Sequence, residues 1–191
     1  MKSFNIYIIG VGGQGIGLLS QALLRGIDHA GIPALAVDTH GLAQRGGIVV
    51  SQIRCGDRVH SPLIMSRSAD LVLGMEVHEA ARGASLALKK GGTLVFPDVS
   101  WQPLPVRLGR SPEITAEEVI QACTVLGAVS IKLELGTLPD ARMQNMALLG
   151  SVSKNALIPG VSKQHYEAAL DDLLSGDLLK KNWAVFDGFA A

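Results

Sequence analysis

Residues 10–15 read GVGGQG and separate a short apolar run from a long amphipathic segment. The run Asn5 to Ile9 predicts a buried strand, and the apolar positions from Leu19 to Ala30 recur at helical spacing. A G-x-G-x-x-G turn between a strand and a helix is typical of Rossmann-like folds, because its glycines permit a tight turn and the close approach of a phosphate. A tight turn needs glycine even without a ligand, so a purely structural loop stays open. The loop residues expected to bind an anion are Gly10, Gly12, Gly13, Gln14 and Gly15.

The helix after this loop is expected to end at Gly31 and Pro33, and a second strand follows from Ala34 to Asp38. Together these segments have the size of a strand–helix–strand unit with a parallel sheet. Asp38 stands 23 positions after Gly15, where an NAD-binding protein carries its ribose-binding acid. A stand-alone protein that binds NAD(P) or an adenylate is therefore an alternative reading.

Strands and helices alternate as far as residue 98, which predicts an α/β, Rossmann-like, mostly parallel sheet with helices on both faces. Gly56-Asp57 predicts an edge hairpin between 48–54 and 58–60. The C-terminal part is expected to be helical, and the whole chain, 1–191, to form a single domain. Two further strands are expected at 69–74 and 93–96. A helix is expected at 77–90 and ends with Lys89 and Lys90. Further helices are expected at 115–123, with a Thr115/Glu118 capping box, at 128–135, at 140–155, after Ser162 and from Lys180.

The composition excludes several classes of function. Lysines plus arginines number 17 and so do the acids, so the chain lacks the basic field that nucleic-acid binding requires. No apolar stretch reaches the length of a membrane helix, and no secretion signal precedes the first strand. Two cysteines, Cys55 and Cys123, are too few to hold an iron–sulfur cluster, and the five histidines show no metal-binding spacing. A cytoplasmic protein without a metal site of its own is expected.

A second motif, HGLAQRGG at 40–47, follows the second strand, and VSQIR follows at 50–54. With the glycine loop, these motifs resemble the gamma subunit of 2-oxoacid:ferredoxin oxidoreductases, and most closely the beta subunit of indolepyruvate ferredoxin oxidoreductase. SPLI at 61–64, the glutamates and arginine between 76 and 82, and NMALLG at 145–150 extend the resemblance to about residues 5–175. Residues 100–111 match no motif of that family.

The resemblance implies oxidative decarboxylation of a 2-oxoacid, with coenzyme A as co-substrate, to acyl-CoA, CO2 and reduced ferredoxin. Thiamine diphosphate, Mg2+ and [4Fe-4S] clusters are then expected in a large partner subunit, and ferredoxin is expected to meet the assembled complex. This chain is expected to form part of the wall that lines the coenzyme A site and the active site. It is expected to be inactive without its partner subunit. The sequence does not identify the 2-oxoacid.

The second motif supplies the candidate catalytic residues, which are Arg45, Gln44 and His40. Arg45 could hold a carboxylate or phosphate as a two-pronged donor, and an interface salt bridge is the alternative. His40 is otherwise a structural loop residue. Glu76 and Glu79 could form an acid–base pair or only complement a helix dipole. The cofactor-binding residues expected beyond the glycine loop are Arg45, Gly46 and Gly47.

Overall fold

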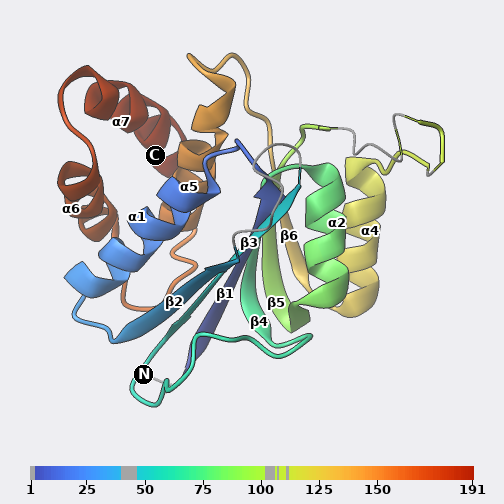
Figure 1. The fold of residues 1–191 in the computed structure, drawn as a ribbon, viewed down its shortest axis with the longest axis horizontal. Coiled ribbons are helices and arrows are strands. Elements are labelled where there is room, and N and C mark those ends of the chain that lie inside the picture. The colour runs from blue at the N-terminus through green and yellow to red at the C-terminus, as the bar shows by residue number, and fades with distance from the viewer. Residues whose placement is uncertain (1–2, 40–46, 102–105, 107, 111) are drawn as a thin grey trace.

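A six-stranded sheet forms the centre of the molecule (Figure 1). The computed structural model describes residues 3–39, 47–101, 106, 108–110 and 112–191. The strands lie in the order β2-β3-β1-β4-β5-β6; β1, β4, β5 and β6 are parallel, and β3 runs antiparallel to both of its neighbours. The strands are β1 (Phe4–Val11), β2 (Ala34–Thr39), β3 (Ile48–Cys55), β4 (Ala69–Gly74), β5 (Leu88–Pro97) and β6 (Val129–Leu133).

Helices cover both faces of the sheet, but unequally (Figure 1). One face carries α1, α5, α6 and α7, and the opposite face carries α2 and α4. The predicted fold class, a Rossmann-like sheet between helical layers with a helical C-terminal part, is confirmed. The helices are α1 (Ile16–His29), α2 (Val77–Leu86), α4 (Ala116–Leu126), the 3-10 turn η1 (Ala141–Met143), α5 (Gln144–Lys154), α6 (Lys163–Leu173) and α7 (Gly176–Ala190).

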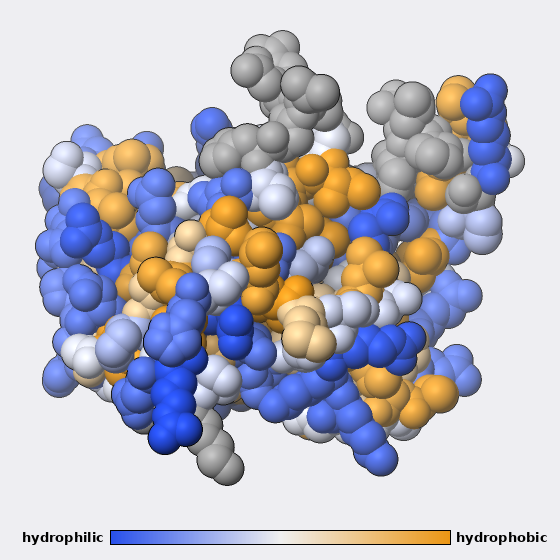
Figure 2. All heavy atoms as spheres, turned by 60° about the horizontal axis from the view of Figure 1, so that its bottom comes forward, coloured by the Kyte–Doolittle hydropathy of each residue, from blue (hydrophilic) through white to orange (hydrophobic). Residues whose placement is uncertain are grey.

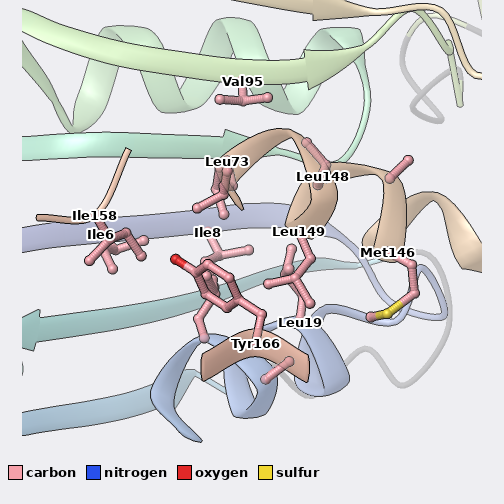
Figure 3. Close-up of a cluster of buried hydrophobic side chains, with 14 of the residues drawn as sticks. Ile6, Ile8, Leu19, Leu73, Val95, Met146, Leu148, Leu149, Ile158 and Tyr166 are labelled. Carbon is pink, nitrogen blue, oxygen red and sulfur yellow. The ribbon is translucent and has the colours of Figure 1, made fainter. Parts of the chain in front are cut away.

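The larger core lies between the sheet and the layer of four helices. Ile6 and Ile8 of β1 point into it, whereas Tyr7 packs on the side of α2, because successive strand residues face opposite ways. Figure 3 shows Tyr166 of α6 beside Ile8 and near Leu19 of α1, so segments far apart in sequence meet on this face. β1 is therefore mostly apolar, because both of its faces are covered.

Two of the predicted helix starts are confirmed by their hydrogen bonds. Thr115 Oγ1 accepts from the N–H of Glu118 at 3.2 Å, and the Glu118 carboxylate accepts from the N–H of Thr115 at 2.8 Å, which completes the capping box of α4. Ser162 is the N-cap residue of α6, and its N–H donates to Nδ1 of His165 at 3.1 Å. The helical part after residue 140 also forms as expected.

An antiparallel pair of strands lies at the edge of the sheet, as expected, but the strands predicted to form it were wrong. It is formed by β2 and β3, which pair from Ala34 opposite Cys55 to Thr39 opposite Val50. Residues 58–60 contain no strand, and the N–H of Gly56 donates to the carbonyl of Pro33 instead. The physical reason is that β3 already has β1 and β2 as partners on its two edges, which leaves no free edge for a returning strand.

Two further predicted elements were wrong. The stretch 128–135, expected as a helix, contains β6, which pairs with the edge of β5. Lys89 and Lys90 were expected at the end of a helix, but α2 ends at Leu86 and both lysines lie in β5. Lys89 there forms an ion pair with Asp70 of β4. In both stretches, pairing with a neighbouring strand decides the structure. A short apolar segment does not by itself distinguish a helix from a strand.

Candidate functional site

The glycine loop lies between β1 and α1, at the carboxyl end of β1, as predicted. Gly13 and Gly15 have φ values of 101° and 80°, a backbone region that other residues rarely adopt. Gln14 is fully buried and folds back, so that its Oε1 accepts from the N–H of Val11 at 2.7 Å. The amide side chain of Gln14 thus closes the loop on itself and holds its shape.

The first turn of α1 has no side-chain cap. Its N-cap residue is Gly15, which offers no side-chain acceptor, and no acidic residue stands in the first turn. By contrast, the Glu76 carboxylate caps α2 and Thr115 caps α4. Free N–H groups and the positive end of the helix dipole make such a start suited to an anion. The N–H groups at the start of α1 are therefore available to an anion. At the starts of α2 and α4, the corresponding N–H groups donate to side chains of the same helix start.

Helix α5 supports the loop from behind. Asn145 Nδ2 donates to the carbonyl of Gly15 at 3.1 Å, and a Cβ on Gly15 would come within 2.6 Å of that nitrogen. A small cavity of about 250 Å3 lies beside this contact, with Arg142 and Asn182 on its walls. In the described part of the chain, the buried atoms Nε2 of Gln14 and Oδ1 of Asn145 have no hydrogen-bond partner. Unpaired buried polar atoms are rare, and a polar partner would stabilise these two.

Gly47, the residue just before β3, contacts the glycine loop. The N–H of Gly12 donates to the carbonyl of Gly47 at 2.9 Å. This bond brings together the end of the second motif and the glycine loop, two of the predicted site segments. Of the remaining predicted site residues, His40, Gln44, Arg45 and Gly46 lie outside the described residues.

A buried polar cluster lies at the carboxyl end of β4, next to the glycine loop. Met75 donates its N–H to the carbonyl of Ile9, which joins the ends of β4 and β1. Glu76 is fully buried and its carboxylate caps α2 by accepting from the N–H of Glu79. The structural reading of Glu76, as a partner of a helix start, is thus confirmed.

His78 connects this cluster to the segment after β5. Its Nδ1 lies 3.2 Å from the Glu76 carboxylate, and its Nε2 accepts from the N–H of Ile114 at 3.4 Å. Nδ1 is then the protonated nitrogen that donates to Glu76. The N–H of Trp101 also donates to Glu76, at 3.2 Å. Glu76 and His78 therefore anchor Trp101 and Ile114, one on each side of the residues between them.

Glu79 is buried beside this cluster, and burial raises the pKa of its carboxyl. The Arg82 guanidinium, which donates to it at 3.1 Å, opposes the increase in pKa, and the Glu76 carboxylate adds to it. The same surroundings raise the pKa of Tyr7, mainly through burial. These increases in pKa follow from the packing of α2 against β1, which buries both side chains.

The residue expected to bind a ribose does not reach the glycine loop. Asp38 lies on β2, which β3 separates from β1, so Asp38 is two strands away from the strand that carries the loop. Its carboxylate instead accepts from the hydroxyl of Ser20 in α1, at 3.3 Å. The NAD-binding arrangement predicted as an alternative is therefore not formed by these residues.

The two cysteines are both buried and unpaired, and they belong to different cores on opposite faces of the sheet. Burial raises the pKa of the Cys55 thiol to about 11 and also raises the pKa of Cys123. A metal cluster requires several thiolates that converge on one point, and two buried thiols on opposite faces do not fit one. Among the described residues, no group of three or more histidines, cysteines or acids is arranged to hold a metal ion.

Within the described ranges, no helix combines the length and the apolar character that crossing a bilayer requires.

Part of this site was not evident from the sequence. The contact of Asn145 with Gly15 joins residues 130 positions apart, and local periodicity carries no signal for such a pair. The sequence does contain one signal for the uncapped start of α1, because residues 15–18 read GIGL, with no serine, threonine, aspartate or asparagine to cap it.

Comparisons with known proteins agree with this architecture. The sequence model of the family described as pyruvate ferredoxin/flavodoxin oxidoreductase matches residues 5–190. The chain is 34% identical over 199 residues to the indolepyruvate oxidoreductase subunit IorB of Methanothermobacter thermautotrophicus, which covers 99% of this chain and 97% of that protein.

Two solved structures share the fold at 18% sequence identity. One is the 2-oxoglutarate:ferredoxin oxidoreductase of Magnetococcus marinus with 2-oxoglutarate, coenzyme A and succinyl-CoA bound, with a TM-score of 0.72 over 100% of this chain and 31% of that one. The other is the gamma subunit of a keto/oxoacid ferredoxin oxidoreductase from Geobacter sulfurreducens, with a TM-score of 0.67 over 97% of this chain and 96% of that one. This chain thus spans about a third of the first protein and nearly all of the second.

Proposed function

Because the chain belongs to the pyruvate ferredoxin/flavodoxin oxidoreductase family, we propose that its glycine loop forms the wall of the active site that receives the diphosphate of coenzyme A. The chain is a small subunit of a 2-oxoacid:ferredoxin oxidoreductase complex, which is the class of its family and of its full-length relatives. The alternative of a stand-alone NAD(P)- or adenylate-binding protein has no support, since Asp38 lies away from the loop.

The proposed reaction breaks the bond between the carboxylate and the carbonyl carbon of a 2-oxoacid and releases CO2. The sulfur of coenzyme A becomes bonded to the former carbonyl carbon, a proton is released, and two electrons pass to two ferredoxin molecules. Thiamine diphosphate with Mg2+ supplies the carbanion chemistry, and [4Fe-4S] clusters carry the electrons, in a large partner subunit. The buried cysteines of this chain do not fit such a cluster, so its own contribution is binding and orientation.

The uncapped start of α1 is the observation that carries this proposal. A diphosphate placed there would accept from the free N–H groups of the first turn without meeting a carboxylate. The buried Nε2 of Gln14 has no partner among the described residues and supplies a further donor in the same loop. Gly47, bound to Gly12, is two positions from Arg45, so we also propose Arg45 as a second anchor for the diphosphate or for the oxoacid carboxylate.

We infer indolepyruvate as the oxoacid, because the relative that is 34% identical over nearly its full length carries that substrate in its name. The two free cysteines also suit a reducing compartment, so we propose that the complex works in the cytoplasm. The match of one family to residues 5–190 supports treating the chain as one domain.

Gly17 offers a direct test, because a Cβ at this position in the first turn of α1 would meet no atom within 4 Å beyond its chain neighbours and the backbone of its own helix. Gly17→Asp would place a carboxylate where the diphosphate is proposed to bind. The chain is co-expressed with its large subunit, and ferredoxin reduction is measured with indolepyruvate over a range of coenzyme A concentrations. We expect the KM for coenzyme A to rise about 5- to 30-fold, which corresponds to the roughly 1–2 kcal/mol of a charge at a helix end.

Gly17→Ala is the matched control, since it adds a Cβ without a charge. It should leave the KM for coenzyme A within about twofold of wild type and stabilise α1 by roughly 0.5–1 kcal/mol, as alanine favours helices over glycine. Equal KM values for the alanine and aspartate variants would show that the loop is only a turn. Failure of the wild-type chain to join an active complex would contradict the proposed function itself.

A further inference from the structure

A groove lies between α2 and α4. These two helices cover the face of the sheet opposite α1 (Figure 1). The volume of the groove is about 780 Å3, and its lining is mostly apolar. The two helices meet it with small side chains, which include Ala81, Ala84 and Ser85 of α2 and Ala122 of α4. Small residues on neighbouring parallel helices leave a channel between them into which the side chains of another helix can pack.

Large apolar side chains stand exposed at the lower end of this groove. Val125, in its lining, is 84% exposed, and Leu86, at the end of α2, is 51% exposed. Met65, in the segment that leads into β4, is 78% exposed. Figure 2, which brings the underside of Figure 1 forward, shows apolar side chains on the side of α2 and α4 as well as at its centre. Clusters of exposed apolar side chains are typical of surfaces to which another molecule binds.

The two ends of the groove carry opposite charges. Arg67 lies at the C-terminal end of α2, where its N–H donates to the carbonyl of Leu86 at 3.0 Å. Glu118 lies in the first turn of α4, at the other end. Arg67 is exposed, and its guanidinium forms no ion pair with any side chain of the described ranges. Its backbone is left-handed, with φ of 55°, which costs free energy and fixes the direction in which the side chain leaves the chain.

We propose that an amphipathic helix of the large, thiamine-binding subunit lies in this groove with its apolar face inward. The inference rests on the proposed function, because it takes that subunit as the partner. The charges favour one direction, in which the positive N-terminal end of the docked helix lies near Glu118 and its negative C-terminal end lies near Arg67. α2 has 10 residues, about 15 Å, so the docked helix makes contact over about three turns.

The test measures the affinity of this chain for its co-expressed large subunit. Ala122→Arg places a long charged side chain in the middle of the groove from an exposed position. Its matched control is Ala184→Arg, at an exposed position of α7 on the other side of the sheet. We expect Ala122→Arg to weaken binding at least about 30-fold, as blocking a central contact does, and the control to remain within about twofold.

Charge reversal tests the direction of the helix. Arg67→Glu should weaken binding about 5- to 10-fold, and the effect should shrink as salt is added. Lys181→Glu in α7 is the matched control and should have no effect. Thermal unfolding of each isolated variant checks that the fold is intact. Hydroxyl-radical footprinting of the wild-type complex should show Val125 and Leu86 protected relative to the isolated chain.

Several outcomes would overturn the inference. If the complex forms and both groove variants bind like wild type, the large subunit docks elsewhere, while the proposed function stands. If Ala122→Arg instead turns a dimer of this chain into a monomer and leaves the complex unchanged, the groove serves a second copy. If the wild-type chain forms no complex, the proposed function and the docking inference both fail.

Discussion

Gln14 shows why an amide, rather than a carboxylate, suits the glycine loop. Its Oε1 accepts the N–H of Val11, and its Nε2 remains a buried donor without a partner in the described part of the chain. A glutamate of the same size could form the first bond, but it would add a negative charge and lose the donor. Glutamine therefore closes the turn and also keeps the start of α1 electrostatically favourable for an anion.

Glu79 makes stability depend on pH. Burial raises the pKa of its carboxyl in the folded chain above that in the unfolded chain, and Arg82 only partly opposes this. The folded chain then binds the proton more tightly, so the stabilisation is fully present below the unfolded pKa, near 4.3, and is lost as pH rises through the folded pKa. The expected outcome is that the free energy of unfolding of wild type, relative to Glu79→Gln, decreases as pH rises from about 4.

Urea unfolding between pH 4 and pH 8 measures this difference. Glu117→Gln is a suitable control, because Glu117 is exposed in the first turn of α4. The control should show no comparable pH dependence. A Glu79→Gln profile parallel to that of wild type would show that the pKa of Glu79 is the same in the folded and unfolded chains.

At the scale of single elements, the capping box of α4 should contribute measurably to stability. Thr115→Ala removes the side-chain oxygen that accepts from the N–H of Glu118. The expected loss is about 1 kcal/mol in the free energy of unfolding, measured in urea. Thr124→Ala, the same substitution in the last turn of the same helix, should change stability by less than about 0.5 kcal/mol. Equal losses for both threonines would contradict a specific role for the cap.

How far each element could be predicted depends on the range of the interactions that fix it. β1, the glycine loop and the capping box are local, so spacing and residue type predict them. The position of β3 between β1 and β2 results from pairing across the sheet, and no local pattern distinguishes it from a hairpin with residues 58–60. β6 was predicted as a helix because five residues, Val129–Leu133, are too few to show a period.

The candidate site divides in the same way. The loop glycines and Gln14 follow from their motif, and the hydrogen bond from Gly12 to Gly47 brings the end of the second motif to the glycine loop. Asn145 and the missing cap of α1 depend on which distant element packs against the loop. The sequence therefore predicts the residues of the loop better than the distant residues that support it.

For the whole molecule, the two cysteines report whether both helical layers unfold together. Cys55 belongs to the core under α1 and Cys123 to the core under α4. With both thiols buried and their pKa values raised, labelling in the native chain at pH 8 should be slow. If the sheet unfolds as one unit, both cysteines should react with the same dependence on urea, measured by mass spectrometry. Earlier labelling of Cys123 would show that the α2–α4 layer opens independently.

The packing of α1 against α6 has a consequence for synthesis on the ribosome. His29, at the end of α1, meets Asp172 of α6, a residue 143 positions later. At roughly 5–20 residues per second, about 7–30 s pass between the synthesis of these two residues. During that interval the apolar side of α1, which includes Leu19, Leu23 and Ile27, lacks its final cover. The nascent chain should therefore engage chaperones through this helix until the last helices have emerged.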